Sequence, residues 1–173
     1  MKRATREAKE VSLIESAGAI RSGPMGAMSG EVVITKVEMV GEDGASRWDF
    51  VAGEAVSVRI YYEAKRDLPR PVFSVAIHTP DGYYINAHNT YADEFGIALV
   101  RGKGVVELYY PSLPLGRGEY LLSVGVFKEP DEPLWRNAVD CHEKAYGFFV
   151  YSDLFIHGVA VIPAKWEHRS LEE

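Results

Sequence analysis

Short segments in which hydrophobic and polar side chains alternate dominate the sequence from residue 31 onward. The hydrophobic residues of the clearest segment occupy every second position: Val56, Val58, Ile60 and Tyr62. Successive side chains of a β-strand point to opposite faces, so this period of two predicts a strand with one buried and one polar face. The same alternation returns in residues 72–79 and 119–127. Because each strand must bury its apolar face, the pattern predicts a β-sandwich.

About eight strands are expected between residues 31 and 166, with turns rich in Gly, Pro and Asp between them. The expected ranges are residues 32–40, 55–64, 72–79, 83–89, 105–110, 119–127, 145–151 and 159–162. Residues 65–71 are expected to form a turn, and residues 128–144 a long polar loop. Gly118, Glu119 and Tyr120 also match a tyrosine corner, in which a buried tyrosine hydroxyl bonds to the backbone. The predicted fold class is all-β, an immunoglobulin-like antiparallel β-sandwich.

The first 29 residues differ in composition from the rest. Residues 2–17 are rich in Ala, Glu, Lys and Arg and predict a short helix, and residues 18–30 are rich in Gly, Ser and Ala, which is typical of linkers. We therefore expect a helical or flexible linker over residues 1–29 and a single β-sandwich domain over residues 30–173.

Composition and charge argue against several classes of partner. A net charge of -6 and a pI near 5.4 disfavour a phosphate backbone, so nucleic acid is not expected as a partner. The only cysteine, Cys141, cannot form an internal disulfide, which favours a reducing, cytoplasmic setting. No segment reaches the roughly 20 apolar residues of a membrane helix, so direct membrane insertion is not expected.

Catalytic motifs are missing from the sequence. It contains no phosphate-binding P-loop, no dinucleotide fingerprint, no H-E-x-x-H and no G-x-S-x-G. The five histidines are not spaced as metal ligands. Acidic residues such as Asp81, Asp93, Glu94 and Asp140 are interpreted as solvated turn formers rather than as a glycosidase pair. We expect a non-catalytic protein without metal or other cofactor.

Three runs of sequence resemble a known family. They are FSVAIHTPDGYYINAHNT (Phe73–Thr90), LPLGRGEYLLSVGVF (Leu113–Phe127) and FFVYSDLFIHGVAVIPAKW (Phe148–Trp166). In this order and spacing they resemble the C-terminal domain of Wzt, the nucleotide-binding subunit of the ABC transporters that export bacterial O-antigen polysaccharide. The resemblance covers roughly residues 30–166.

The resemblance implies a binding function. The fold would be an immunoglobulin-like sandwich that dimerises, in some members by exchange of the C-terminal strand. The ligand would be the exported lipopolysaccharide O-antigen glycan, often recognised at its modified non-reducing end. The protein would act in the cytoplasm, at the inner membrane, with the ATPase and membrane subunits of the transporter. The ATPase domain typical of the family is absent from this sequence, so residues 1–29 would be an inter-domain linker or part of a separately encoded module.

A site for the glycan is predicted from side chains that point outward. Sugar recognition requires aromatic faces for the C–H side of the ring and planar polar groups for the hydroxyls. The outward residues of two predicted strands are small, Ser74 and Ala76 on one and Ser123 and Gly125 on the other. As neighbours in one sheet they would form a shallow trough, with Arg59 at its side. The predicted carbohydrate-binding residues are Tyr61, Ser74, His78, Tyr84, Asn86, His88, Asn89, Arg101, Ser123, Phe127 and Trp135.

Several roles remain open from sequence. Asn89 and Thr90 would either contact ligand or shape a turn. Trp135 would be a stacking lid or a loop anchor, Arg101 a partner for an anionic substituent or a solvated charge, and His78 a sugar donor or an ordinary surface residue. The alternative function is a protein-interaction sandwich without glycan binding, and a third is a degenerate hydrolase. For a homodimer, the segment 159–162 would exchange through a hinge at Ser152 and Asp153.

Overall fold

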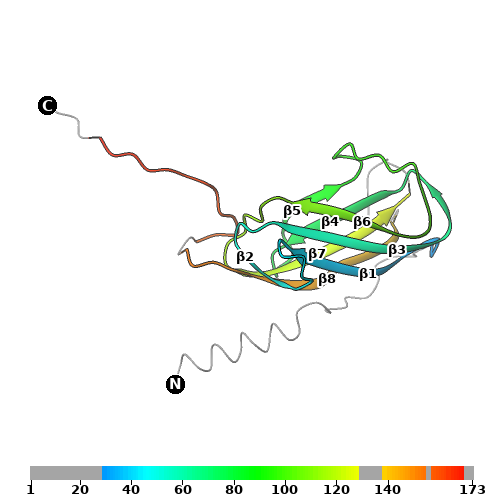
Figure 1. Ribbon diagram of the computed structural model, residues 1–173, viewed down its shortest axis with the longest axis horizontal. Coiled ribbons are helices and arrows are strands. Elements are labelled where there is room, and N and C mark those ends of the chain that lie inside the picture. The colour runs from blue at the N-terminus through cyan, green and yellow to red at the C-terminus, as the bar shows by residue number, and fades with distance from the viewer. Residues whose placement is uncertain (1–28, 129–137, 155–156, 170–173) are drawn as a thin grey trace, which may run out of the picture.

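Two β-sheets packed face to face form the body of the protein (Figure 1). In this computed structural model, residues 29–128, 138–154 and 157–169 are described. The three-stranded sheet has the order β1-β3-β6 and the five-stranded sheet the order β2-β8-β7-β4-β5. The strands are β1 (Val32–Gly41), β2 (Asp49–Val51), β3 (Val56–Pro69), β4 (Val72–His78), β5 (Tyr84–Asn89), β6 (Leu99–Tyr110), β7 (Gly118–Phe127) and β8 (Ala138–Tyr151).

The predicted immunoglobulin-like β-sandwich is confirmed. All pairings are antiparallel except that between β2 and β8, which is parallel. The alternate residues predicted to point inward lie in the core, with Val58 and Leu122 fully buried. The tyrosine corner is also present, because the Tyr120 hydroxyl donates a 2.7 Å hydrogen bond to the Gly116 carbonyl. The predicted helix of residues 2–17 lies outside the described residues.

Several strand limits differ from the prediction. The strand β2 was missed because it has only three residues. The strand β8 begins at Ala138, so residues 138–144 of the expected polar loop are strand instead. Residues 159–162 were expected to form a strand, but only Ala160 is bridged, to Leu115. Beyond that bridge the C-terminal segment extends away from the body (Figure 1).

A buried carboxylate in β8 joins the two sheets. Asp140 is 4% exposed and its side chain accepts a 2.6 Å hydrogen bond from the Ile34 amide of β1. That amide lies at a register shift in the β1–β3 ladder, between Ile34 and Lys36. The second carboxylate oxygen accepts a 2.8 Å bond from the Cys141 amide. Buried backbone N–H groups require acceptors, so Asp140 supplies the acceptor that the irregular ladder does not offer to Ile34.

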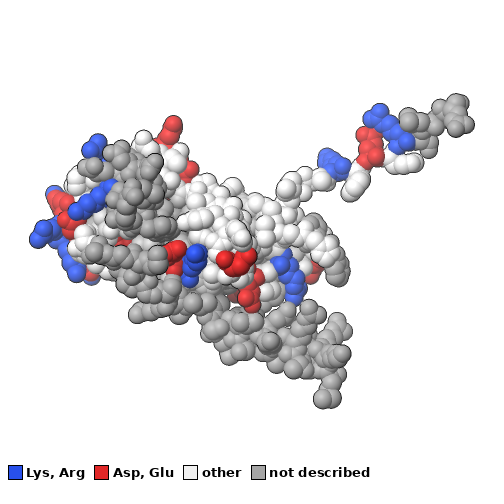
Figure 2. Space-filling model, turned by 180° about the vertical axis from the view of Figure 1, so that it is seen from behind, with Lys and Arg blue, Asp and Glu red and all other residues white. Residues whose placement is uncertain are grey.

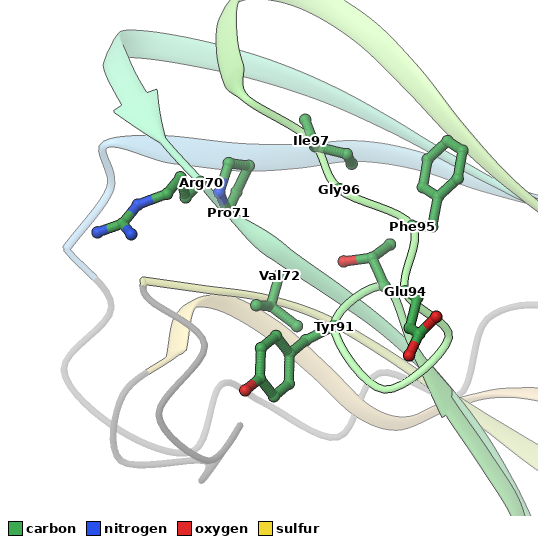
Figure 3. A pocket seen from close by; sticks show the side chains of 9 residues that line it. Arg70, Pro71, Val72, Tyr91, Glu94, Phe95, Gly96 and Ile97 are labelled. Atoms are coloured by element: carbon green, nitrogen blue, oxygen red, sulfur yellow. The ribbon is translucent and has the colours of Figure 1, made fainter.

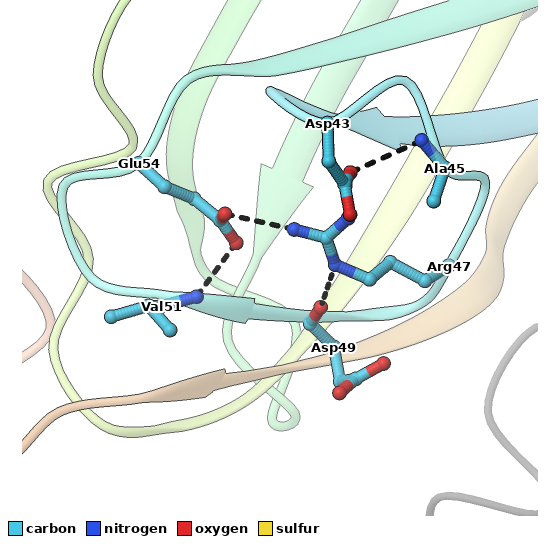
Figure 4. Close-up of polar contacts among 6 residues, drawn as sticks. All are labelled: Asp43, Ala45, Arg47, Asp49, Val51 and Glu54. Atoms are coloured by element: carbon cyan, nitrogen blue, oxygen red, sulfur yellow. Dashed lines mark hydrogen bonds and ion pairs between the residues drawn. The ribbon is translucent and has the colours of Figure 1, made fainter.

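An arginine cluster fixes the loop between β1 and β2 (Figure 4). Arg47 donates to the Asp49 carbonyl at 3.0 Å and forms ion pairs with Asp43 at 2.6 Å and Glu54 at 2.8 Å. Glu54 in turn accepts a 2.8 Å bond from the Val51 amide. The hydrogen bond from the Ala45 amide, followed by that from Arg47, lowers the pKa of Asp43. The planar guanidinium thus ties both sides of the loop together.

We predict that replacing Asp140 will loosen the junction between the sheets. Asp140→Ala leaves the Ile34 and Cys141 amides without their carboxylate acceptor, which should lower the free energy of unfolding by roughly 2–4 kcal/mol. Urea unfolding followed by circular dichroism measures the change. Asp153→Ala, at an exposed position after β8, serves as the control and should stay within about 0.5 kcal/mol of the parent. Equal stability of the Asp140→Ala variant and the parent would contradict this role.

Candidate functional site

The two strands predicted to form the trough are neighbours in the five-stranded sheet. Ser74 of β4 lies opposite Gly125 of β7, and Ala76 lies opposite Ser123. Their neighbours Phe73, Val75, Leu122 and Val124 belong to the core, so the small residues share the outward face. This part of the prediction is confirmed.

The trough itself is filled by the protein's own side chains, so the expectation of an open groove there is wrong. The Phe127 ring folds back over Gly125, where an added Cβ would lie 2.8 Å from the ring. Phe127 is 1% exposed, and Ser123 and His78 are completely buried. The exposed Tyr84 ring lies 4.4 Å from the His78 ring, centroid to centroid. The small residues therefore make room for packing.

A bulge in β8 closes the other end of the trough. Three residues of β8, 143–145, lie opposite the single residue Ser123, and Lys144 has a φ of 48°. This places the Lys144 amide 2.7 Å from the Ser123 hydroxyl oxygen, to which it donates. The same hydroxyl is 2.8 Å from Nε2 of His78. Burial, and secondarily the charge of Lys144, lowers the pKa of His78 from its usual 6.5.

Three of the predicted site residues do not belong to this face. Tyr61 lies on β3 in the other sheet, where its hydroxyl donates to Glu38 at 2.9 Å, and Arg59 on the same strand pairs with Glu107 at 2.8 Å. Arg101 lies on β6 and forms an ion pair with Asp67. Sequence alternation gives the face of a residue within its own sheet but not which sheet the strand joins. Another predicted residue, Trp135, lies outside the described residues.

A cleft opens instead between β5 and β6, the strands at one edge of each sheet. No backbone hydrogen-bond ladder joins these two edges. A hollow of about 200 Å³, here called the inter-sheet hollow, lies between them. Its lining includes the core residues Ile60, Phe73 and Val75, the β6 residues Val106 and Leu108, and, at the rim, His88, Asn89, Thr90, Asp93, Phe95 and Glu107. The hollow thus has an apolar floor and a polar rim.

The polar side chains of β5 that were predicted from sequence lie at this cleft. His88 Nδ1 is 2.9 Å from the Asp93 carboxylate, and the His88 ring meets Tyr110 edge-on at 5.7 Å. The Tyr110 hydroxyl donates to Asn86 at 3.3 Å. Burial, and secondarily Asp93, raises the pKa of Tyr110. These groups hold the edge of the cleft in one arrangement.

Asn89 and Thr90 shape the turn that follows β5. The Asn89 side-chain oxygen accepts a 2.8 Å bond from the Ala92 amide, and Thr90 exchanges backbone and side-chain bonds with Phe73. The sequence left open whether this pair shapes a turn, and the structure gives both residues that role. They position the loop that carries Tyr91 and Phe95.

A second hollow adjoins the first beneath this loop (Figure 3). The loop hollow has a volume of about 360 Å³ and shares Thr90 and Phe95 with the inter-sheet hollow. Tyr91 and Phe95 are 60% and 62% exposed, and Val72 and Ile97 also line the hollow. In Figure 3 the Tyr91 ring lies beside Val72, whereas the Arg70 side chain points away from the loop. Two aromatic faces are therefore offered to solvent along one continuous cleft.

Sequence reasoning missed the aromatic residues of this loop. The signal was present, because Tyr91 and Phe95 stand in the otherwise polar run TYADEFG, where large apolar side chains have no strand face to cover. Asp93 was named only as a turn former. An exposed aromatic residue inside a polar loop is the kind of feature that marks a binding surface.

Charges of both signs lie together on one face of the protein (Figure 2). Lys and Arg side chains lie among Asp and Glu on the face seen in Figure 2. Among the described residues, no three His, Cys, Asp or Glu side chains are grouped as metal ligands.

The same part of the chain includes no helix with the length and hydropathy of a membrane span. The thiol of Cys141 is buried, and burial raises its pKa to about 12.

Comparison with protein families matches residues 26–162 to the family described as the Wzt C-terminal domain. Among solved structures, the crystal structure of the C-terminal domain of Wzt matches with a TM-score of 0.76 and 17% identity, covering 91% of this chain and 95% of that chain. A CARDB domain from Pyrococcus furiosus (14% identity, 72% and 97% covered) and an immunoglobulin-like protein from Pseudomonas aeruginosa (16% identity, 72% and 100% covered) match with TM-scores of only 0.36. A search of curated proteins gives no match.

We predict that His78 makes the fold sensitive to acid. Its pKa is lowered in the folded state, so the unfolded chain binds a proton at pH values where the folded chain does not. The free energy of unfolding should therefore fall as the pH drops below about 6.5. His78→Gln, which cannot titrate, should show a smaller decrease between pH 7.5 and 5 in urea unfolding. His168→Gln, exposed in the C-terminal segment, should retain the parent's decrease, and an unchanged decrease in His78→Gln would contradict the prediction.

Proposed function

The chain belongs to the Wzt C-terminal domain family, and on this premise we propose that it is a non-catalytic carbohydrate-binding module that recognises an O-antigen polysaccharide for export by an ABC transporter. Its partners are the glycan and the ATPase and membrane subunits of the transporter, and it acts at the cytoplasmic side of the inner membrane. The observation that carries the proposal is the cleft between β5 and β6, where exposed aromatic rings stand beside polar groups in a member of this family.

We place the glycan in this cleft rather than over the filled trough. Phe95 stands between the two hollows and lines both. Its exposed ring offers a flat apolar face to the C–H side of a pyranose, and Tyr91 offers a second ring. His88 and Asp93 at the rim supply nitrogen and oxygen atoms that hydrogen-bond to sugar hydroxyls. Two hollows that share one wall suit consecutive residues of a polysaccharide better than a single compact ligand.

The residues of the filled trough support the cleft indirectly. Ser74, His78, Ser123 and Phe127 lie on the outward face of β4 and β7, and β5 pairs with β4 along its length. Packing on that face therefore fixes the edge strand from which His88 and Asn86 project. Tyr84, 56% exposed, is the one member of the predicted set over the trough whose ring remains open to a glycan that extends past β5.

The C-terminal segment supports the expected homodimer. Its root is held by the bridge between Leu115 and Ala160 and by a 2.7 Å bond from the Val161 amide to the Pro114 carbonyl. Ile162 and Trp166 beyond it are 79% and 101% exposed. Pairing with a second copy would remove these large apolar side chains from water, which is favourable. We infer that this segment is exchanged or paired in the dimer.

Replacing Phe95 tests the placement of the glycan. Phe95→Ala removes the ring shared by both hollows and should weaken binding of an O-antigen polysaccharide roughly tenfold, because the stacking face is lost. Isothermal titration against a panel of purified O-polysaccharides measures the affinity. Tyr109→Ala is the matched control, since Tyr109 is 59% exposed but alternates to the outward face of β6, in the other sheet. Equal losses in both variants would argue against this cleft, and no binding to any polysaccharide by the parent would favour the protein-interaction alternative.

Replacing Ile162 tests the dimer. Ile162→Asp puts a charge on the exposed apolar segment while leaving the bridge at Ala160 in place, and it should shift a dimer toward monomer at micromolar concentration. A chain ending at Gly158 should have the same effect. Light scattering after size-exclusion chromatography measures the mass, with His168→Ala as the control. A parent that is already monomeric at these concentrations would contradict the inference.

A further inference from the structure

We propose that the inter-sheet hollow selects a 6-deoxy sugar, a residue that carries a methyl group where an ordinary hexose carries its exocyclic hydroxymethyl. This inference rests on the proposed function, because it takes the cleft as a glycan site and assigns the chemistry of one sugar within it. The methyl group and the adjoining ring edge enter the hollow, and the ring hydroxyls stay at the rim.

The floor of the hollow is hydrocarbon. Ile60, Phe73 and Val75 are 1%, 2% and 4% exposed and belong to the main core, and Val106 and Leu108 of β6 form the wall. A hydroxyl placed against such a floor loses its hydrogen bonds to water and finds no replacement. A methyl group placed there gains burial and loses nothing.

The polar groups at the rim already have partners within the protein. His88 is bonded to Asp93, the Asn89 side chain to the Ala92 amide, and the Thr90 hydroxyl to the Phe73 amide. The Glu107 carboxylate is paired with Arg59. These contacts fix the rim groups in place, and their remaining donor and acceptor sites can satisfy the ring hydroxyls there, whereas a hydroxyl below the rim meets only hydrocarbon.

The size of the hollow limits what enters it. The inter-sheet hollow, at about 200 Å³, is smaller than the loop hollow, at about 360 Å³. It accommodates the methyl-bearing edge of one sugar. The larger loop hollow, on the other side of Phe95, then receives the next residue of the polysaccharide, where Tyr91 and the more open surface tolerate an ordinary hexose.

Matched sugars that differ by a single hydroxyl test the selection. We would titrate the full chain with L-rhamnose and L-mannose, and with L-fucose and L-galactose, following backbone amide shifts by NMR. We expect shifts in residues 86–97 and 104–108 and at least about fourfold tighter binding of the deoxy member of one or both pairs, the factor that corresponds to burial of one methyl group.

Two variants of adjacent residues localise the effect. Val106→Phe fills the inter-sheet hollow from its β6 wall and should abolish the preference for the deoxy sugar. Val105→Phe adds the same ring at the next residue, which is 50% exposed and alternates to the outward face, and should leave the preference intact. Both variants replace one Val by Phe, so they differ only in where the ring is added. A thermal melt of each variant shows whether the two retain the fold equally.

The outcomes separate this inference from the function on which it rests. If matched sugars bind with equal affinity and shift the cleft residues, the deoxy selection is overturned and the glycan site stands. A preference that survives in Val106→Phe overturns the inter-sheet hollow as its source. If no sugar shifts any amide of the cleft, the glycan site fails and the selection fails with it.

Discussion

The hydrogen bond from the Ile34 amide to the buried carboxylate of Asp140 sets the asymmetry of this sandwich. It ties β1, the edge of the three-stranded sheet, to β8 of the five-stranded sheet, so that one side of the sandwich is closed by a charge-assisted contact. On the other side, β5 and β6 share no ladder and meet through side chains such as Tyr110 and Asn86. The binding site that we propose lies at this unpaired edge, where the core comes nearest to solvent without being exposed.

The filled trough and the open cleft show two uses of small and aromatic residues on one sheet. Gly125 has no side chain because the Phe127 ring occupies the space above it, beside the Ser74 hydroxyl. Phe95, by contrast, stands on a loop whose backbone is fixed by Asn89 and Thr90, so its ring is held out to solvent. Rigid support for an exposed ring lowers the entropy lost on binding. The sheet that carries the filled trough on its outward face thus also holds β5, the strand that leads into the loop of the cleft.

Much of the fold could be predicted from the alternation of hydrophobic and polar residues, because residues such as Val58 and Leu122 are spaced as one buried face of a strand. The start of β8 could not be predicted, since residues 138–144 have the composition of a polar loop. The reason for a buried Asp140 within a strand, its bond to the Ile34 amide, is visible only in the structure. The neighbouring strands of the trough were predicted correctly, but its filling depends on the direction of one ring, Phe127, which sequence does not specify. His88 and Asn86 were chosen for their chemistry and lie at the cleft, whereas Tyr61 and Arg101 were misplaced because spacing does not say which sheet a strand joins.

The positions of the cleft and of the C-terminal segment allow binding and dimerisation to be independent. Along β4 and β7, Val72 lies opposite Phe127 at the end that carries the loop hollow, and His78 lies opposite Leu121 at the other end, near the tyrosine corner where the C-terminal segment is rooted. A dimer formed through that segment leaves both clefts open. Two linked clefts on one polysaccharide raise the apparent affinity by effective concentration, without any new contact. For the polysaccharide ligand that we propose, a weak site in each copy would then be sufficient.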